Sequence, residues 1–140
     1  MIQHILLATD GSAPAERATD FAAILATHTR AKVTVLHVRH VISTNLGEPY
    51  FEEEVRKTLD EATALVEKTA RRLREQRASE IETDVIGGSP GEVILTIAET
   101  RHVDLIVMGA RGLNPLQSIL LGSVSQAVIQ HALCPVTVVK

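Results

Sequence analysis

The stretch VDLIVMGARG, residues 103–112, decides the fold that we predict for this chain. Its run LIVM is continuously apolar, whereas a strand with one face in water alternates apolar and polar residues, so we expect a strand that is covered on both faces. The run ILLA, residues 5–8, has the same character. Two such strands are typical of the centre of a parallel sheet that carries helices on both sides, which is the α/β class.

Strands and helices are predicted to alternate along the whole chain. Five runs rich in aliphatic and β-branched residues are the expected strands: IQHILLA (2–8), KVTVLHV (32–38), IETDVIG (81–87), VDLIVMG (103–109) and PVTVVK (135–140). Segments of helical periodicity separate them, which predicts parallel strands and right-handed crossovers. The third run alternates with charged residues and suits a sheet edge. We therefore predict one α/β domain, residues 1–140, with a doubly wound five-stranded parallel sheet in the order 3-2-1-4-5 and helices on both faces.

The apolar residues between these runs predict which helix faces are buried. The first helix would bury Ala18, Phe21, Ala22 and Leu25, the long second helix Val55, Leu59, Ala62, Val66, Ala70 and Leu73, and the third Val93, Ile94, Ile97 and Ala98. Ser89 and Glu92 have the spacing of a capping box at the start of the third helix. The fourth is expected to begin near Ser123 and to end before Cys134, because a residue that precedes proline avoids the helical region.

Composition excludes several classes of function. Aromatic residues make up only 2% of the chain and the net charge is -3, so we expect no nucleic-acid binding, which needs stacking rings or a basic surface. No apolar run is long enough for a membrane span, and a cytoplasmic location is the expectation. The single Cys134 can form no internal disulfide and is predicted to be a small buried apolar residue.

Four small residues follow the predicted central strands in a regular spacing. Gly109 and Gly112 come directly after the strand at 103–109, and nine residues later Gly122 and Ser123 stand where a helix begins, giving G-x2-G-x9-G-S. In a doubly wound sheet the ligand crevice lies outside the carboxyl ends of the two central strands, where the winding reverses. A glycine loop and a helix start at that point can present backbone N–H groups to phosphate. The alternative is that these are ordinary turn and cap residues, since glycine after a strand and serine before a helix are common.

Other chemistry-bearing residues do not assemble into a recognisable catalytic or metal site. His37 and His40 are three residues apart, a spacing that in a strand points side chains to opposite faces, so we expect no metal site there. His131 is expected to pack on the fourth helix. Ser12 is expected to cap a helix, because no G-x-S-x-G elbow surrounds it. No GK[ST] follows the glycines, so the loop is not a P-loop.

The chain resembles the universal stress protein family along its full length. The likeness lies in the glycine spacing above together with ILLATDGS (5–12), LHV (36–38), DLIVMGARG (104–112) and LLGSVSQAVIQHALCPVTVV (120–139). The resemblance implies ATP bound with a divalent metal, Mg²⁺ or Mn²⁺, that the phosphates carry. From its place after the first strand, Asp10 can hold a ribose hydroxyl or that metal. The resemblance further implies that the ATP site consists of Ala8, Thr9, Asp10, Val38, Met108, Gly109, Arg111, Gly112, Gly122, Ser123, Val124 and Ser125. In this assignment Val38 offers backbone hydrogen bonds to adenine. Ala110 stands where many members carry serine or threonine, so one hydroxyl is missing.

Two hypotheses for the function remain open at this point. The first is a nucleotide-dependent stress-response protein that works through an unidentified protein partner. It would be no dedicated enzyme and at most a slow ATPase, because the sequence supplies no strong general base. The second is an ATP-independent dimeric interaction scaffold of the same fold. Under both, the resemblance implies a homodimer formed by the last strand, residues 135–139. The irregular segment 41–51 could cover the crevice.

Overall fold

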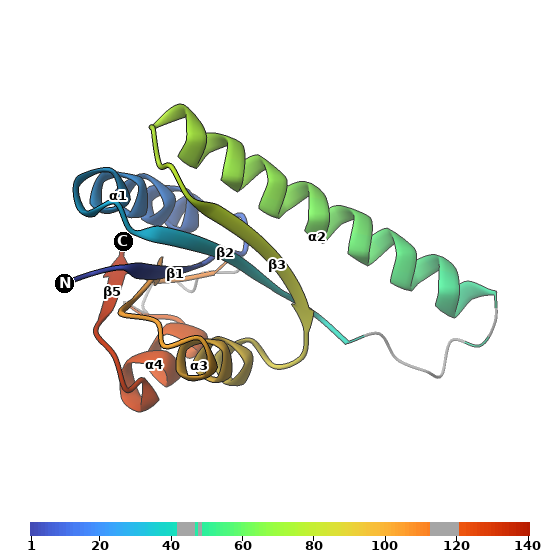
Figure 1. Cartoon of the computed structure of the whole chain (residues 1–140). Coiled ribbons are helices and arrows are strands. Elements are labelled where there is room, and N and C mark those ends of the chain that lie inside the picture. The colour runs from blue at the N-terminus through green and yellow to red at the C-terminus, as the bar shows by residue number, and fades with distance from the viewer. Residues whose placement is uncertain (42–46, 48, 113–120) are drawn as a thin grey trace.

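The computed structural model describes residues 1–41, 47, 49–112 and 121–140. Strands and helices alternate from one end of the chain to the other (Figure 1). The elements are β1 (His4–Ala8), α1 (Ala13–Thr29), β2 (Lys32–Arg39), α2 (Tyr50–Glu75), β3 (Ile81–Gly87), α3 (Pro90–Thr100), β4 (Leu105–Gly109), α4 (Ser123–His131) and β5 (Val136–Val139). All five predicted strands are therefore confirmed, each within a few residues of its expected bounds.

The strands form one parallel sheet in the order β3-β2-β1-β4-β5, which confirms the predicted doubly wound topology. β1 lies at the centre, and its last residue, Ala8, is opposite Leu36 of β2 and Met108 of β4. Residues 5–8 and 105–108 are all buried, as their continuously apolar sequence predicts.

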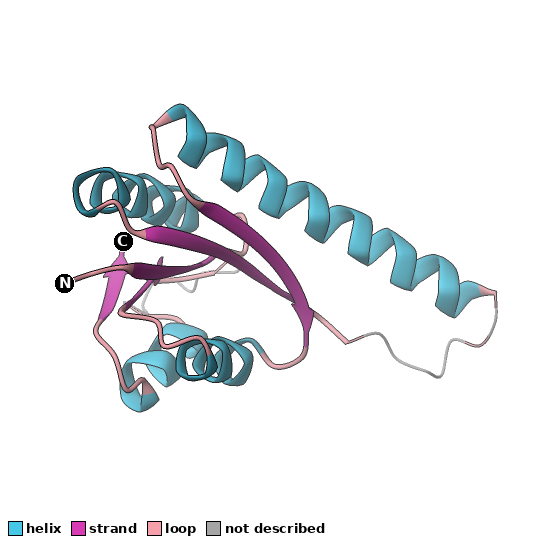
Figure 2. Cartoon of the chain, in the orientation of Figure 1, coloured by secondary structure: helices cyan, strands magenta, loops and turns pink. Residues whose placement is uncertain are grey.

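Helices cover both faces of the sheet (Figure 2). Alternate residues of each strand face opposite layers, so Ile5 and Leu7 pack with the buried residues of α1 and α2, whereas Leu6 and Ala8 pack with those of α3 and α4. Among the described residues, the helices lie on the two faces of the sheet and not over the carboxyl ends of its strands. The loops after β1 and β4 meet at these carboxyl ends.

The buried face of α1 differs from the expectation at Phe21, and the predicted Leu25 is only half-buried. Phe21 is 37% exposed, while the ridge Ala15, Ala18, Ala22 and Ala26 is buried against the sheet. Phe21 lies well around the helix from this ridge, so the prediction that its ring is buried is wrong. The alanines let the helix approach the sheet closely, and a ring would not fit in that gap.

The stripe predicted for α2 is confirmed only in the second half of the helix. Ala62, Val66, Ala70 and Leu73 are buried, but Val55 is half-buried and Leu59 is 37% exposed. The reason is that the first half of α2 extends past the edge strand β3 (Figure 1), so no strand lies beneath it.

The helix starts follow the sequence signals, with one exception in their side-chain chemistry. The Ser12 hydroxyl accepts a hydrogen bond from the Ala15 N–H at 3.3 Å, as expected of a cap. α3 begins at Pro90 after Ser89, as predicted, but the Ser89 side chain makes no capping hydrogen bond, so the predicted capping box is wrong. Pro90 has no N–H, which leaves the first turn of α3 with fewer donors that need an acceptor.

Among the described residues, no helix has the length and apolar character that crossing a membrane requires.

Candidate functional site

The candidate site is the point at which the winding of the sheet reverses, between the carboxyl ends of β1 and β4. Ala8 and Met108 are register partners there, and both are buried. The loop that follows β1 begins at Thr9, and the loop that follows β4 begins at Ala110. The two predicted binding stretches, after β1 and after β4, are about a hundred residues apart in the sequence. The structure brings them together at the carboxyl ends of these two strands.

The loop after β1 is held by its own side chains. The Gly11 N–H donates to the Thr9 hydroxyl at 3.2 Å, and the Ser12 N–H donates to Asp10 Oδ1 at 3.0 Å. Gly11 has a φ of +79°, a conformation that side chains other than hydrogen rarely allow. As a result, the Asp10 carboxylate has one oxygen anchored and stays at the crevice.

The two loops touch across the crevice. A β-carbon on Gly112 would lie 2.9 Å from Asp10 Oδ2, so only glycine lets the second carboxylate oxygen approach the loop after β4. The Ser12 hydroxyl also donates to the Arg111 carbonyl, at 3.5 Å. Asp10, Arg111 and Gly112 of the predicted set are thus brought together.

Gly109 has a purely structural reason to be glycine. A β-carbon at this position would lie 2.9 Å from the Ala15 backbone nitrogen and 3.0 Å from Pro14. The first turn of α1 rests on the end of β4 at this distance, so a side chain on Gly109 would push the helix away.

Gly122 has no such reason. Its φ is -75°, which any residue adopts, and a β-carbon would have an ordinary contact of 3.5 Å to the Ala110 carbonyl oxygen. Its N–H donates to that oxygen at 2.7 Å, and the Ser125 hydroxyl donates to the same oxygen at 2.8 Å. The start of α4 is therefore fixed to the loop after β4, while a β-carbon on Gly122 would make only ordinary contacts with the described residues.

The first turn of α4 presents backbone N–H donors next to the loop after β4. Ser123 is exposed, Val124 is half-buried and Ser125 is buried, and Gly122 supplies no side-chain cap. The N–H groups at the start of a helix have no carbonyl partner in the helix itself, and the helix dipole makes that end partly positive. This end of α4 can accept an anion.

The sequence predicts no role for His37, yet this residue contacts the site directly. Its Nδ1 lies 2.8 Å from the Thr9 carbonyl oxygen, beside Val38 at the end of β2. The spacing of histidines could not reveal this contact, because it depends on which strand neighbours β2. His131, by contrast, is exposed at the last residue of α4, so the prediction that it packs is wrong.

Cys134 is half-buried and not fully buried as predicted. It packs against the core beneath α3 and α4, and burial raises the pKa of its thiol above the ordinary value of 9.0. A raised pKa keeps the thiol protonated, which favours a packing role over reactivity.

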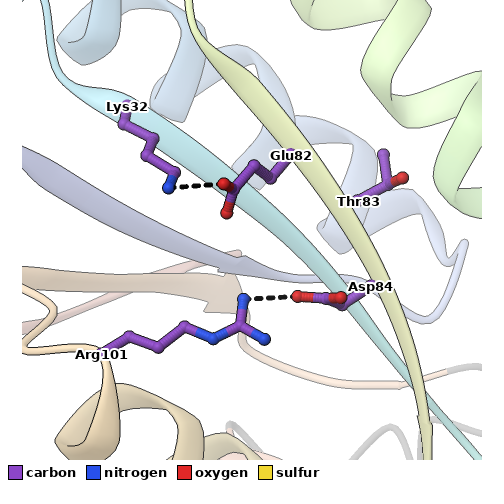
Figure 3. A pocket seen from close by; sticks show the side chains of 5 residues that line it. All are labelled: Lys32, Glu82, Thr83, Asp84 and Arg101. Carbon is purple, nitrogen blue, oxygen red and sulfur yellow. Dashed lines mark hydrogen bonds and ion pairs between the residues drawn. The ribbon is translucent and has the colours of Figure 1, made fainter.

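A polar groove of about 540 Å³ is lined by Lys32, Glu82, Thr83, Asp84 and Arg101 (Figure 3). Lys32 stands at the first residue of β2, whereas the crevice is at the opposite end of the strands. Two ion pairs line the groove: Lys32 with Glu82 at 2.6 Å, and Arg101 with Asp84. The hydrogen bond from Lys32 lowers the pKa of Glu82, and burial lowers that of the neighbouring His4. Because each charge already has its counter-charge, the groove is less suited to a charged ligand than the open start of α4.

The fold and the crevice define a class, namely a doubly wound α/β protein whose ligand site lies at the reversal of the sheet. Comparison with known proteins narrows it: the model of the universal stress protein family matches residues 1–140, and the chain belongs to this family. A universal stress protein of Thermus aquaticus is 38% identical over the whole of both chains.

Solved structures agree with this assignment. The universal stress protein UspA of Lactobacillus plantarum superposes with a TM-score of 0.88 at 27% identity, covering 99% of this chain and 97% of the other. A universal stress protein solved in complex with cAMP has a TM-score of 0.78 at 26% identity, with the same coverage. Some members of this fold thus bind adenine nucleotides.

Most of the segment 41–51 lies outside the described residues, since residues 42–46 and 48 are not described. The prediction that it covers the crevice therefore remains a prediction.

Proposed function

We propose that this protein binds ATP in the crevice between the carboxyl ends of β1 and β4, with Mg²⁺ or Mn²⁺ carried by the phosphates. The observation that carries the proposal is Gly122. Neither its φ nor its neighbours among the described residues require glycine, yet a side chain here would stand where the start of α4 meets the loop after β4, with its β-carbon 3.5 Å from the Ala110 carbonyl oxygen and from the Arg111 Cα. A ligand that needs close approach to the backbone explains the glycine better than the turn does.

The residues of the crevice have two different roles in the proposed site, phosphate binding and adenosine binding. The first-turn N–H groups of α4, at Ser123, Val124 and Ser125, hold the phosphates, and the loop Gly109, Arg111 and Gly112 lines them. Since the Ser125 hydroxyl donates to Ala110, its contribution is the backbone N–H. Ala8, Thr9, Val38 and Met108 border the adenosine.

Asp10 is suited to the ribose or to the metal. Its carboxylate is anchored through Oδ1 by the Ser12 N–H, while Oδ2 faces Gly112. A single carboxylate together with phosphate oxygens and water is a common ligand set for Mg²⁺. The affinity for the metal therefore depends mainly on the nucleotide.

Hydrolysis is slow at most. Asp10 is the acidic side chain in the described part of the crevice, and its contacts suit binding more than proton abstraction. We propose that the chain is a one-domain stress-response protein of the cytoplasm. Occupancy of the site changes the crevice loops and thereby a surface that a protein partner recognises.

We also propose a homodimer through β5. The two edges of the sheet differ: β3 carries Glu82 and Asp84 in ion pairs, whereas β5 has the uncharged sequence VTVV. Charges on an edge discourage strand addition, and an uncharged edge invites it. A second copy related by a twofold axis would cover β5.

Calorimetric titration of the nucleotide-stripped full-length protein with ATP and Mg²⁺ tests the ATP site. We expect one site per chain in the wild type and at least about tenfold weaker binding in Gly122→Ala. Gly91→Ala is the matched control, because this glycine also lies at a helix start and a β-carbon there has an ordinary contact of 3.4 Å. It should bind as the wild type does. If the wild type binds no ATP, the proposal is wrong and the ATP-independent scaffold takes its place.

A further inference from the structure

We propose that His37 is a specificity-determining residue that keeps the backbone of Val38 available to an adenine base. The inference rests on the proposed nucleotide site and assigns to it a residue with no expected role. Its basis is the way in which the hydrogen-bond ladder between β1 and β2 ends.

Alternate residues of β2 direct their backbone N–H and C=O groups toward β1 and toward β3. In a parallel pair, every second residue of a strand points both its N–H and its C=O at the same neighbour. The Lys32 N–H donates to the Gln3 carbonyl, and the Leu36 carbonyl accepts from the Thr9 N–H at 2.9 Å. The even-numbered residues of β2 therefore face β1, and Val38 is the next of them.

The next bond of the ladder would run from the Val38 N–H to the Thr9 carbonyl. It is not formed, and the register of the two strands ends at the pair Ala8 and Leu36. The Thr9 carbonyl instead accepts from His37 Nδ1 at 2.8 Å. Since a carbonyl oxygen can only accept, this ring nitrogen carries a proton. Because a carbonyl oxygen can accept two hydrogen bonds, His37 acts by turning the Thr9 carbonyl toward its own ring and away from the Val38 N–H.

The consequence is a donor and an acceptor side by side beyond the end of β1. Because Val38 is an even-numbered residue of β2, its N–H and C=O both point to the side of β1, at the crevice. Adenine presents its N6 amino donor between two ring acceptors, N1 and N7, so either of its edges matches this pair. Guanine presents the reverse order, the O6 acceptor beside the N1–H donor, so a guanine base in the same orientation would place O6 against the Val38 carbonyl. A site whose polar groups would be left unpaired by the wrong ligand rejects that ligand strongly.

Two substitutions separate this role from packing. His37→Val removes the donor and keeps a residue that favours strands, so the Thr9 carbonyl becomes free to accept from Val38. His37→Asn is the matched control, because the asparagine Nδ2 occupies about the position of the histidine Nδ1 and can donate to Thr9.

The first test is calorimetric titration of the full-length protein and both variants with ATP, 1-deaza-ATP and 7-deaza-ATP. In the wild type, one deaza analogue should bind about three- to tenfold more weakly than ATP, because it lacks the ring acceptor for the Val38 N–H. His37→Val should bind ATP as weakly as that analogue and show no further loss with it. His37→Asn should behave as the wild type. Equal loss with the analogue in wild type and His37→Val would overturn the proposal.

The second test needs no nucleotide. Hydrogen exchange measured by NMR on the free protein should show a fast-exchanging Val38 amide in the wild type and in His37→Asn, and a protected one in His37→Val. Fast exchange of this amide in all three proteins contradicts the proposal. If the wild type binds no ATP while the Val38 amide still changes as expected, the ATP site is wrong and the role of His37 in the ladder stands.

Discussion

A β-carbon on Gly109 would lie 2.9 Å from the backbone nitrogen of Ala15, so the end of β4 and the start of α1 meet at a distance that only glycine allows. A β-carbon on Gly122, in the same sequence signature, would lie 3.5 Å from its nearest neighbour, an ordinary contact. One glycine of the signature is therefore required by the fold, and the other is free to serve a ligand.

This difference predicts unequal losses of stability for two alanine substitutions. Gly109→Ala should lower the free energy of unfolding by about 1–3 kcal/mol, because the new methyl group forces α1 away from the sheet. Gly122→Ala should cost about 1 kcal/mol at most, the difference between glycine and alanine as a helix cap. Urea denaturation followed by circular dichroism measures both. A larger loss at Gly122 than at Gly109 would contradict this assignment of roles.

The β5 edge predicts a substitution that separates the dimer without unfolding the chain. The Ala110 N–H donates to the Val139 carbonyl and the Ile106 N–H to the Pro135 carbonyl, so odd-numbered residues of β5 face β4. The Val138 N–H therefore points to the free edge, and Val138→Pro removes it while sparing the bonds to β4.

Light scattering at micromolar concentration should give a dimer for the wild type and a monomer for Val138→Pro. The control is Thr83→Pro on the opposite edge. Its N–H faces away from β2, because the Val33 N–H donates to the Glu80 carbonyl and even-numbered residues of β3 thus face β2. This variant should stay dimeric. A monomeric wild type would rule out the dimer.

The uneven burial of α2 predicts a contrast between two leucines of one helix. Leu73 is fully buried, so Leu73→Ala should cost about 2–5 kcal/mol of unfolding free energy. Leu59 is 37% exposed on the part of α2 that extends past β3, so Leu59→Ala should cost less than about 1 kcal/mol. Equal losses in thermal or urea unfolding would mean that the first half of α2 is packed as tightly as the second.

The sequence predicts the sheet well because burial on two faces leaves a direct mark in composition. ILLA and LIVM are central, and the charged IETDVIG is at the edge, as their patterns indicate. Helix faces were harder to predict, since periodicity shows that a residue lies on an apolar stripe and not how far the sheet extends beneath it. Leu59 and Phe21 are the examples.

The place of the site could be predicted from the sequence, but the contacts within it could not. Glycines after a buried strand mark the crevice, whereas the separate reasons for Gly109 and Gly122 depend on which atoms of α1 and of the loop after β4 come near them. The contact of His37 with Thr9 depends on strand order and on where a ladder ends. Neither property is encoded in local spacing.

The start of β1 predicts a sensitivity to acid. Asp104 Oδ2 accepts hydrogen bonds from the backbone N–H groups of Gln3 and His4, both at 2.9 Å. These bonds hold the pKa of the Asp104 carboxyl below its ordinary value of 3.8. Because the folded pKa is depressed, the stabilisation is fully present above the unfolded pKa and is lost as the pH falls through the folded pKa.

The expected result is a free energy of unfolding that decreases below about pH 4 in the wild type and decreases less steeply in Asp104→Asn. At neutral pH the variant should be less stable, since a neutral amide oxygen is a weaker acceptor than a carboxylate for two N–H groups. Urea unfolding between about pH 2 and 7 measures both slopes. Asp60→Asn is a suitable control, because Asp60 is exposed on the half of α2 that the sheet does not cover. Identical pH profiles for the wild type and Asp104→Asn would show that these two hydrogen bonds contribute nothing to the acid response.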